Sequence, residues 1–168
     1  MKDIEKKHKV FVGIGSNLDQ QKNIKECIKA LDSRYIDLKL SPVYESSSMG
    51  FDGPNFYNLA ASFLTNLELV DLKNELNQME FDSGRKKNEE KYSSRTLDID
   101  ILYFDDLVDK NMNIPRSEIE DYDFVLRPLF ELDPFHIHPV LLKSHYRMLN
   151  ESIYKKMISN EVVIDLTL

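Results

Sequence analysis

The alternation of apolar and polar residues divides the chain into segments with strand-like or helix-like spacing. Runs rich in β-branched and aromatic residues predict strands, and apolar residues three or four positions apart predict helices. The predicted strands are residues 9–14, 36–47, 56–67 and 95–104, and the predicted helices between them are residues 20–33 and 68–83. Pro42 interrupts the second strand, which indicates an edge position or a bulge.

Cap and turn residues support these boundaries. Asp19 or Asn17 can cap the first helix, and Gly84 ends the second. The glycine- and proline-containing segment 47–55 predicts a loop that joins two paired strands.

The order β-α-β-β-α-β predicts an α+β fold of the ferredoxin-like type, an antiparallel sheet with two helices packed on one face. An irregular C-terminal arm, a short helix near residues 124–132 and a final helix over residues 141–157 follow this unit. The segment 162–168 could add a short strand. Because the chain has no repeat and no linker, we expect a single domain over residues 1–168.

Two acidic residues, Asp98 and Asp100, interrupt the apolar run RTLDIDILYF of residues 95–104. Residues two apart in a strand point to the same face, so these carboxylates would stand side by side. Their repulsion favours a cation between them, and Mg²⁺ prefers oxygen ligands of this kind. The alternative is a pair of edge-strand aspartates that face water or pair with Arg95 and a lysine.

Positive charge gathers in GRKKNEEKYSSR, residues 84–95, directly before these aspartates. Its arginines and lysines could bind the phosphates of a metal–triphosphate complex. The alternative is a solvated charged turn, which is what most charge runs are.

A second half of the site is suggested by GPNFYN, residues 53–58. Phe56 and Asn58 would share a strand face, and Phe124 lies in the later arm. Two aromatic rings could sandwich a flat heterocycle while an asparagine amide binds its edge. The alternative is that both phenylalanines belong to the core.

Two further motifs give weaker indications. GIGSN, residues 13–17, lacks the third glycine of a dinucleotide-binding fingerprint and is not a Walker A loop. His136 and His138 could share a metal ion, but a Zn²⁺ site would need further ligands that are not evident nearby.

Composition narrows the class of protein. The net charge of −7 argues against a general nucleic-acid-binding protein. The one cysteine, Cys27, falls on the apolar stripe of the first predicted helix, where a buried role is expected rather than a reactive thiol. The sequence has neither a membrane-spanning apolar stretch nor a secretory signal, so we expect a cytoplasmic protein.

Together these motifs resemble the 6-hydroxymethyl-7,8-dihydropterin pyrophosphokinase family of folate biosynthesis. The matching segments occur in the family's order and cover nearly all of the chain before the last predicted helix. They are GIGSN, SPVYESSSMGFDGPNFYN, the GR that opens the basic loop, RTLDIDIL, Ile114-Pro115, and FVLRPLFEL followed by HP.

The resemblance implies an ATP-dependent diphosphotransferase (pyrophosphokinase). The β,γ-pyrophosphoryl unit of ATP would pass to the hydroxymethyl oxygen of the pterin, giving AMP and the pterin diphosphate, with two Mg²⁺ ions at Asp98 and Asp100. It implies catalytic roles for Arg85, Arg95, Asp98, Asp100 and Arg116. It implies pterin contacts from Ser46, Ser47, Met49, Phe56, Asn58, Asp98 and Phe124. It implies ATP contacts from Asn77, Glu80, Arg85, Lys87, Lys91, Tyr92, Arg95, Ile101 and Arg116.

Five residues depart from what the family usually carries. Lys87 and Lys91 replace arginines, and lysine keeps the charge but loses the bidentate fork. Tyr92 replaces a tryptophan, Arg116 a histidine and Tyr122 an arginine. All five would lie on the nucleotide side, so we expect an active enzyme with altered ATP affinity or loop closure.

Two other functions fit parts of the sequence. A non-catalytic relative could bind pterin or nucleotide as a sensor or as a partner of another folate-pathway enzyme, although the retained Asp98, Asp100 and Arg95 argue against it. An RNA-recognition module would need exposed aromatic residues and a basic surface. The net acidity, and acidic residues expected on a central strand, argue against that module.

Overall fold

The computed structural model describes residues 7–48, 50–85, 93–156 and 164–165 of the chain. Its strands are β1 (His8–Ser16), β2 (Ile36–Leu40), β3 (Tyr44–Ser46), β4 (Phe56–Thr65), β5 (Asp98–Phe104) and β6 (Ile164–Asp165). Its helices are α1 (Gln20–Arg34), α2 (Leu69–Asp82), α3 (Glu118–Asp121), α4 (Asp123–Leu132) and α5 (His145–Lys156). The predicted order of elements is confirmed, but the short α3 was not predicted. The segment 36–47 forms two strands because Pro42 falls between them.

The strands form an antiparallel sheet in the order β5-β1-β4-β3-β6, and β2 also pairs with β4. β1 pairs along its whole length with residues 57–65 of β4, and β3 pairs with β4 across the predicted loop. Among the described strands, β5 pairs with β1 alone and therefore stands at one end of the order. The expectation of a central strand for the two aspartates was wrong, so that argument against an RNA-recognition module falls.

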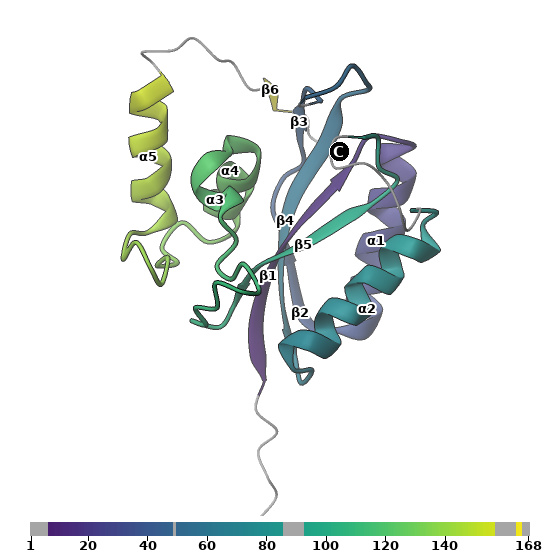
Figure 1. The fold of residues 1–168 in the computed structure, drawn as a ribbon, viewed down its shortest axis with the longest axis horizontal. Helices are drawn as coiled ribbons and strands as arrows, with labels where there is room; N and C mark the ends of the chain where they lie inside the picture. Colours follow the sequence, from purple (N-terminus) through teal and green to yellow (C-terminus); the bar gives the residue numbers. More distant parts are fainter. Residues whose placement is uncertain (1–6, 49, 86–92, 157–163, 166–168) are drawn as a thin grey trace, which may run out of the picture.

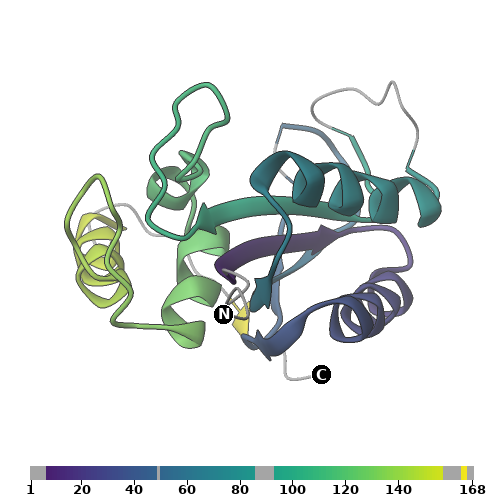
Figure 2. The ribbon, with the colours of Figure 1, turned by 90° about the horizontal axis from the view of Figure 1, so that it is seen from below.

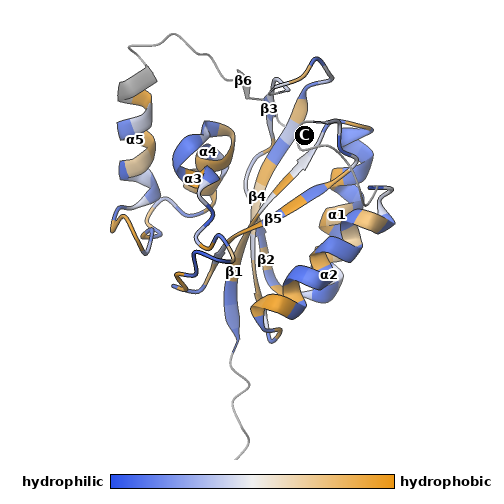
Figure 3. Cartoon of the chain, viewed as in Figure 1, coloured by the Kyte–Doolittle hydropathy of each residue, from blue (hydrophilic) through white to orange (hydrophobic). Residues whose placement is uncertain are grey.

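Helices cover both faces of the sheet (Figures 1 and 2). On one face, α1 and α2 bury Ile24 and Leu72 against Val12 and Phe63 of the sheet. On the other face, α4 and α5 enclose a second core that contains Phe11 and Ala60 from the sheet. Figure 3 shows apolar residues concentrated along the middle of the sheet. The two helices predicted on one face are confirmed, and the C-terminal arm supplies a further layer on the opposite face.

The helix ends follow the sequence only in part. Gly84 has a φ of 100° just beyond the end of α2, a conformation that glycine adopts without the cost of a Cβ clash. Asp19 occupies the N-cap position of α1, as predicted, but its side chain makes no capping hydrogen bond. Cys27 is buried as predicted, and burial raises the pKa of its thiol to about 12. Within the described residues, no helix combines the length and apolar character needed to cross a bilayer.

Candidate active site

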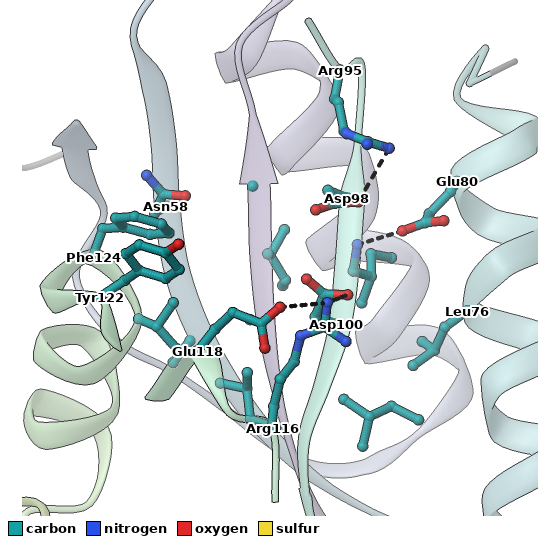
Figure 4. Close-up of a pocket in the computed structure, with 18 of the residues that line it drawn as sticks. Asn58, Leu76, Glu80, Arg95, Asp98, Asp100, Arg116, Glu118, Tyr122 and Phe124 are labelled. Carbon is teal, nitrogen blue, oxygen red and sulfur yellow. Dashed lines mark hydrogen bonds and ion pairs between the residues drawn. The ribbon is translucent and has the colours of Figure 1, made fainter. Parts of the chain in front are cut away.

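A cleft of about 760 Å³ opens between α2 and the arm that leads into α4, over strands β1, β4 and β5 (Figure 4). Every predicted site residue that the structure describes lines this cleft. They are Ser46, Ser47, Phe56, Asn58, Asn77, Glu80, Arg85, Arg95, Asp98, Asp100, Ile101, Arg116 and Phe124. Met49, Lys87, Lys91 and Tyr92 lie outside the described residues. The individual roles of all these residues stay predictions.

The aspartates stand on one face of β5, as their spacing predicts. Asp98 lies opposite Gly15 of β1, and Asp100 lies opposite Gly13. Burial raises the pKa of Asp100 to about 6, and the negative charge of Asp98 adds to this shift while Arg116 opposes it. A bound cation would relieve the repulsion between the two carboxylates.

Three arginines converge on this pair. Arg85 places Nη1 2.9 Å from Oδ1 of Asp98, and Arg95 places Nη1 3.8 Å from the same oxygen. Arg116 places Nη2 2.9 Å from Oδ1 of Asp100. The predicted alternative of pairing with Arg95 is therefore present for Asp98. The same arginines line the cleft, where they could also bind phosphate oxygens.

Long-range hydrogen bonds place two of these arginines. Oδ1 of Asn17 accepts a hydrogen bond from the backbone N–H of Arg95 at 2.6 Å, and the Asn17 N–H donates to the Arg95 carbonyl oxygen at 3.0 Å. Asn17 therefore ties the end of β1 to the loop before β5. The Arg116 backbone N–H donates to the Leu102 carbonyl oxygen at 3.0 Å, which fixes the arm beside β5.

The opposite side of the cleft is aromatic and amide-bearing (Figure 4). Nδ2 of Asn58 donates a hydrogen bond to Oγ of Ser46 at 2.8 Å. Phe124 stacks on Tyr122, with ring centroids 5.0 Å apart and an interplanar angle of 17°. Phe56 and Phe124 are only half-buried and line the cleft, which disfavours a purely core role. Tyr122 stacks on Phe124 and so lies beside the aromatic side of the cleft, and its expected role on the nucleotide side stays a prediction.

Sequence reasoning missed Glu118 and the two glycines of GIGSN. Nη2 of Arg116 lies 3.3 Å from Oε1 of Glu118. A Cβ on Gly15 would lie 3.3 Å from Oδ1 of Asn58, so the bare glycine keeps the floor of the cleft open. The strand register indicates the importance of Gly15, because this residue lies between Asn58 on β4 and Asp98 on β5.

The acidic residues fit a metal ion held jointly with a substrate. The described residues contain no group of three or more histidine, cysteine, aspartate or glutamate side chains that could hold a metal. Asp98 and Asp100 together offer two carboxylates in an open cleft, and Mg²⁺ commonly takes one or two carboxylates plus phosphate oxygens and water. Nδ1 of His138 instead accepts hydrogen bonds from the Val140 and Leu141 N–H groups.

Sequence comparisons point to one family. Residues 11–134 match the family described as 7,8-dihydro-6-hydroxymethylpterin-pyrophosphokinase (HPPK). A 2-amino-4-hydroxy-6-hydroxymethyldihydropteridine pyrophosphokinase of Aquifex aeolicus is 36% identical over 138 residues, covering 80% of this chain and 86% of the relative. A protein of the same name from Pseudomonas aeruginosa is 35% identical, covering 75% of this chain and 81% of the relative.

Two larger proteins carry a similar part. The folic acid synthesis protein FOL1 of Dictyostelium discoideum is 36% identical over 143 residues, covering 83% of this chain but 22% of the relative. A crystal structure of Plasmodium falciparum HPPK-DHPS matches 96% of this chain and 46% of that chain, with a TM-score of 0.71 and 11% identity. At that identity, the structural match supports the fold alone.

Proposed function

Because the chain belongs to the 7,8-dihydro-6-hydroxymethylpterin-pyrophosphokinase family, we propose that it transfers pyrophosphate from ATP to 6-hydroxymethyl-7,8-dihydropterin in folate biosynthesis. The observation that carries the proposal is one cleft with two unlike sides. One side has the aspartate pair with three arginines, and the other has stacked aromatic rings beside Asn58.

The aromatic side suits the pterin. A flat heterocycle can lie against Phe124 and Phe56, and the amide of Asn58 can offer both a donor and an acceptor to its edge. The bond from Asn58 to Ser46 orients that amide before the substrate enters. The open floor at Gly15 leaves room for the hydroxymethyl group between Asn58 and Asp98.

The charged side suits the triphosphate. Asp98 and Asp100 would hold the two Mg²⁺ ions that we expect with ATP, and Arg85, Arg95 and Arg116 would bind phosphate oxygens. Bound there, Mg²⁺ would neutralise charge on the triphosphate and on the reacting oxygens.

The reaction needs positioning more than a nucleophilic side chain. The hydroxymethyl oxygen forms a bond to the β-phosphorus, the bond from that phosphorus to the α,β-bridging oxygen breaks, and AMP leaves. The hydroxyl proton passes to solvent or to a carboxylate of the cleft. The chain contributes alignment of the two substrates and positive charge around the transferred group.

The test is AMP release from Mg²⁺ and ATP, with and without 6-hydroxymethyl-7,8-dihydropterin. We expect pterin-dependent AMP from the wild type and a loss of at least about a hundredfold in Asp98→Ala. Asp82→Ala is the matched control, because Asp82 is an exposed carboxylate in α2. Pterin binding without AMP formation by the wild type would instead favour a non-catalytic relative.

An association with another folate-pathway enzyme is a further part of the proposal, motivated by relatives named as bifunctional folate proteins.

A further inference from the structure

Each of the two aspartates shares an arginine with a glutamate. Arg85 pairs with Asp98 and with Glu80. Arg116 pairs with Asp100 and with Glu118, through the same Nη2 atom, at 2.9 and 3.3 Å. Each of these arginines neutralises a carboxylate that the proposed function assigns to Mg²⁺.

We propose that Arg116 is the resident cation of Asp100 in the free protein, and that Glu118 is the positioning residue that keeps Arg116 at the site when a divalent cation takes its place. This inference rests on the proposed function for the identity of the metal-binding carboxylates. It adds that Arg116 and the metal compete for Asp100. It also adds that Glu118 is the second acceptor for the displaced guanidinium.

The competition follows from the atoms involved. Oδ1 of Asp100 is the oxygen that Arg116 occupies, and a metal ion at this carboxylate must compete with that charge-assisted hydrogen bond. The Arg116 side chain can exchange partners while its backbone stays fixed, because its N–H donates to the Leu102 carbonyl oxygen of β5.

Glu118 already pairs with Arg116, and hydrogen bonds of its own hold its carboxylate in place. Its Oε2 accepts hydrogen bonds from Nδ2 of Asn113 at 3.3 Å and from Oγ of Ser117 at 3.1 Å. These two bonds orient the carboxylate and leave Oε1 directed at Arg116 (Figure 4). The second acceptor is therefore held without help from Asp100.

Retaining Arg116 matters because the cleft is rich in negative charge. Asp98, Asp100, Glu80 and Glu118 all line it, and a triphosphate would add more. If the displaced guanidinium moved into solvent, the site would lose a cation as the phosphates arrive. Glu118 keeps that charge within reach of them.

The experiment measures Mn²⁺ binding without nucleotide, by the electron paramagnetic resonance signal of free Mn²⁺. Arg116→Ala removes the competitor and should tighten Mn²⁺ binding by about fivefold, the size expected for a half-exposed ion pair. Glu118→Gln removes the second acceptor and should weaken binding by about the same factor. Arg147→Ala is the matched control, because Arg147 forms an exposed ion pair with Glu151 in α5.

A double-mutant cycle separates this proposal from a general field effect. In the Arg116→Ala background, Glu118→Gln should change Mn²⁺ affinity little, because no arginine remains to be held. An equal loss in both backgrounds would overturn the role of Glu118, and unchanged affinity in Arg116→Ala, or no Mn²⁺ binding by any variant, would overturn the competition. The wild-type AMP assay tests the proposed function separately, so the two failures are distinguishable.

Discussion

The carboxylate of Glu80 in α2 accepts a hydrogen bond from the backbone N–H of Ile99, with Oε1 and N 2.6 Å apart. Ile99 stands between the two aspartates, so this bond fixes the part of β5 that carries them. The other oxygen of Glu80 pairs with Arg85, which itself reaches Asp98. Burial raises the pKa of Glu80 to about 7, the Ile99 hydrogen bond opposes this shift, and the charge of Asp98 adds to it. One buried side chain thus holds both the strand and the arginine.

Two substitutions of Glu80 should separate these tasks. Glu80→Ala leaves the Ile99 N–H without its acceptor and should lower the free energy of unfolding by about 1–3 kcal/mol. Glu80→Gln keeps an amide oxygen there and should retain most of that stability. Both remove the charge that pairs with Arg85, so both should raise the KM for ATP. Urea denaturation and steady-state kinetics measure the two effects.

Glu75→Ala is a suitable control for the same helix, because Glu75 forms a half-exposed pair with Arg34 and does not line the cleft. It should leave the KM for ATP unchanged. Equal losses of stability in Glu80→Ala and Glu80→Gln would contradict the role given to the Ile99 hydrogen bond.

Gly15 has no side chain and lies on the floor of the cleft, so a substitution there should affect the KM for the pterin rather than the KM for ATP. Gly15→Ala would place a Cβ 3.3 Å from Oδ1 of Asn58 and 3.8 Å from Cδ1 of Phe56. Asn58 must then shift, and we expect the KM for the pterin to rise by about tenfold, equivalent to the loss of one good hydrogen bond. Initial rates at varied pterin and at varied ATP distinguish the two substrates.

Gly13 provides the comparison on the same strand. A Cβ there would meet Leu102 no closer than 3.5 Å, an ordinary contact distance. Gly13→Ala should therefore change the pterin KM less than Gly15→Ala. If the KM for ATP rose instead in Gly15→Ala, the assignment of this floor to the pterin would be wrong.

The stacking of Tyr122 on Phe124 predicts a contribution to pterin affinity. Tyr122→Ala removes a ring that supports Phe124 and should weaken pterin binding by about three- to tenfold, which is the usual worth of an aromatic pair. Tyr122→Phe keeps the ring and should bind like the wild type. Isothermal titration calorimetry with the pterin measures both, and equal weakening in the two variants would point to the hydroxyl group instead.

Side chains alternate along a strand, and this alternation made the aspartate pair at the centre of the site predictable. The remaining site residues depend on contacts between segments that are distant in the sequence. Asp98 and Asp100 share a face because side chains alternate along a strand, whichever strand order the sheet adopts. Asn17 looked like a helix cap because the local pattern is the same, but its partner, Arg95, lies 78 residues away. No local pattern could reveal that contact.

The place of Glu118 at the cleft could not be predicted from a local pattern either. It belongs to an arm without hydrophobic periodicity, and its place at the cleft depends on the bond from Arg116 to Leu102 of β5. The partner of Tyr122 was not predicted, because a family pattern gives the position of a residue but not the partner of a substituted side chain. The Tyr122 ring stacks on Phe124, two residues further along the chain.

A buried histidine away from the cleft predicts how stability depends on pH. His145 is fully buried, with Nε2 3.1 Å from the Tyr103 hydroxyl and Nδ1 2.7 Å from the Asp133 carbonyl oxygen. Burial lowers its pKa to about 4 from the ordinary value of 6.5, and the hydrogen bond to Asp133 opposes this shift. Between these two values the unfolded chain binds the proton and the folded chain does not, so stability rises with pH across this window.

The contribution of His145 should be complete above pH 6.5 and should fall away as the pH drops toward 4, by up to about 3 kcal/mol. Urea denaturation of the wild type and of His145→Asn at pH 7.5 and pH 5.0 measures it. Carboxylates and the neighbouring His136 titrate in both proteins, so the quantity that matters is the difference between the two pH dependences. The wild type should lose more stability on acidification than His145→Asn. Parallel losses would mean that protonation of His145 does not oppose folding.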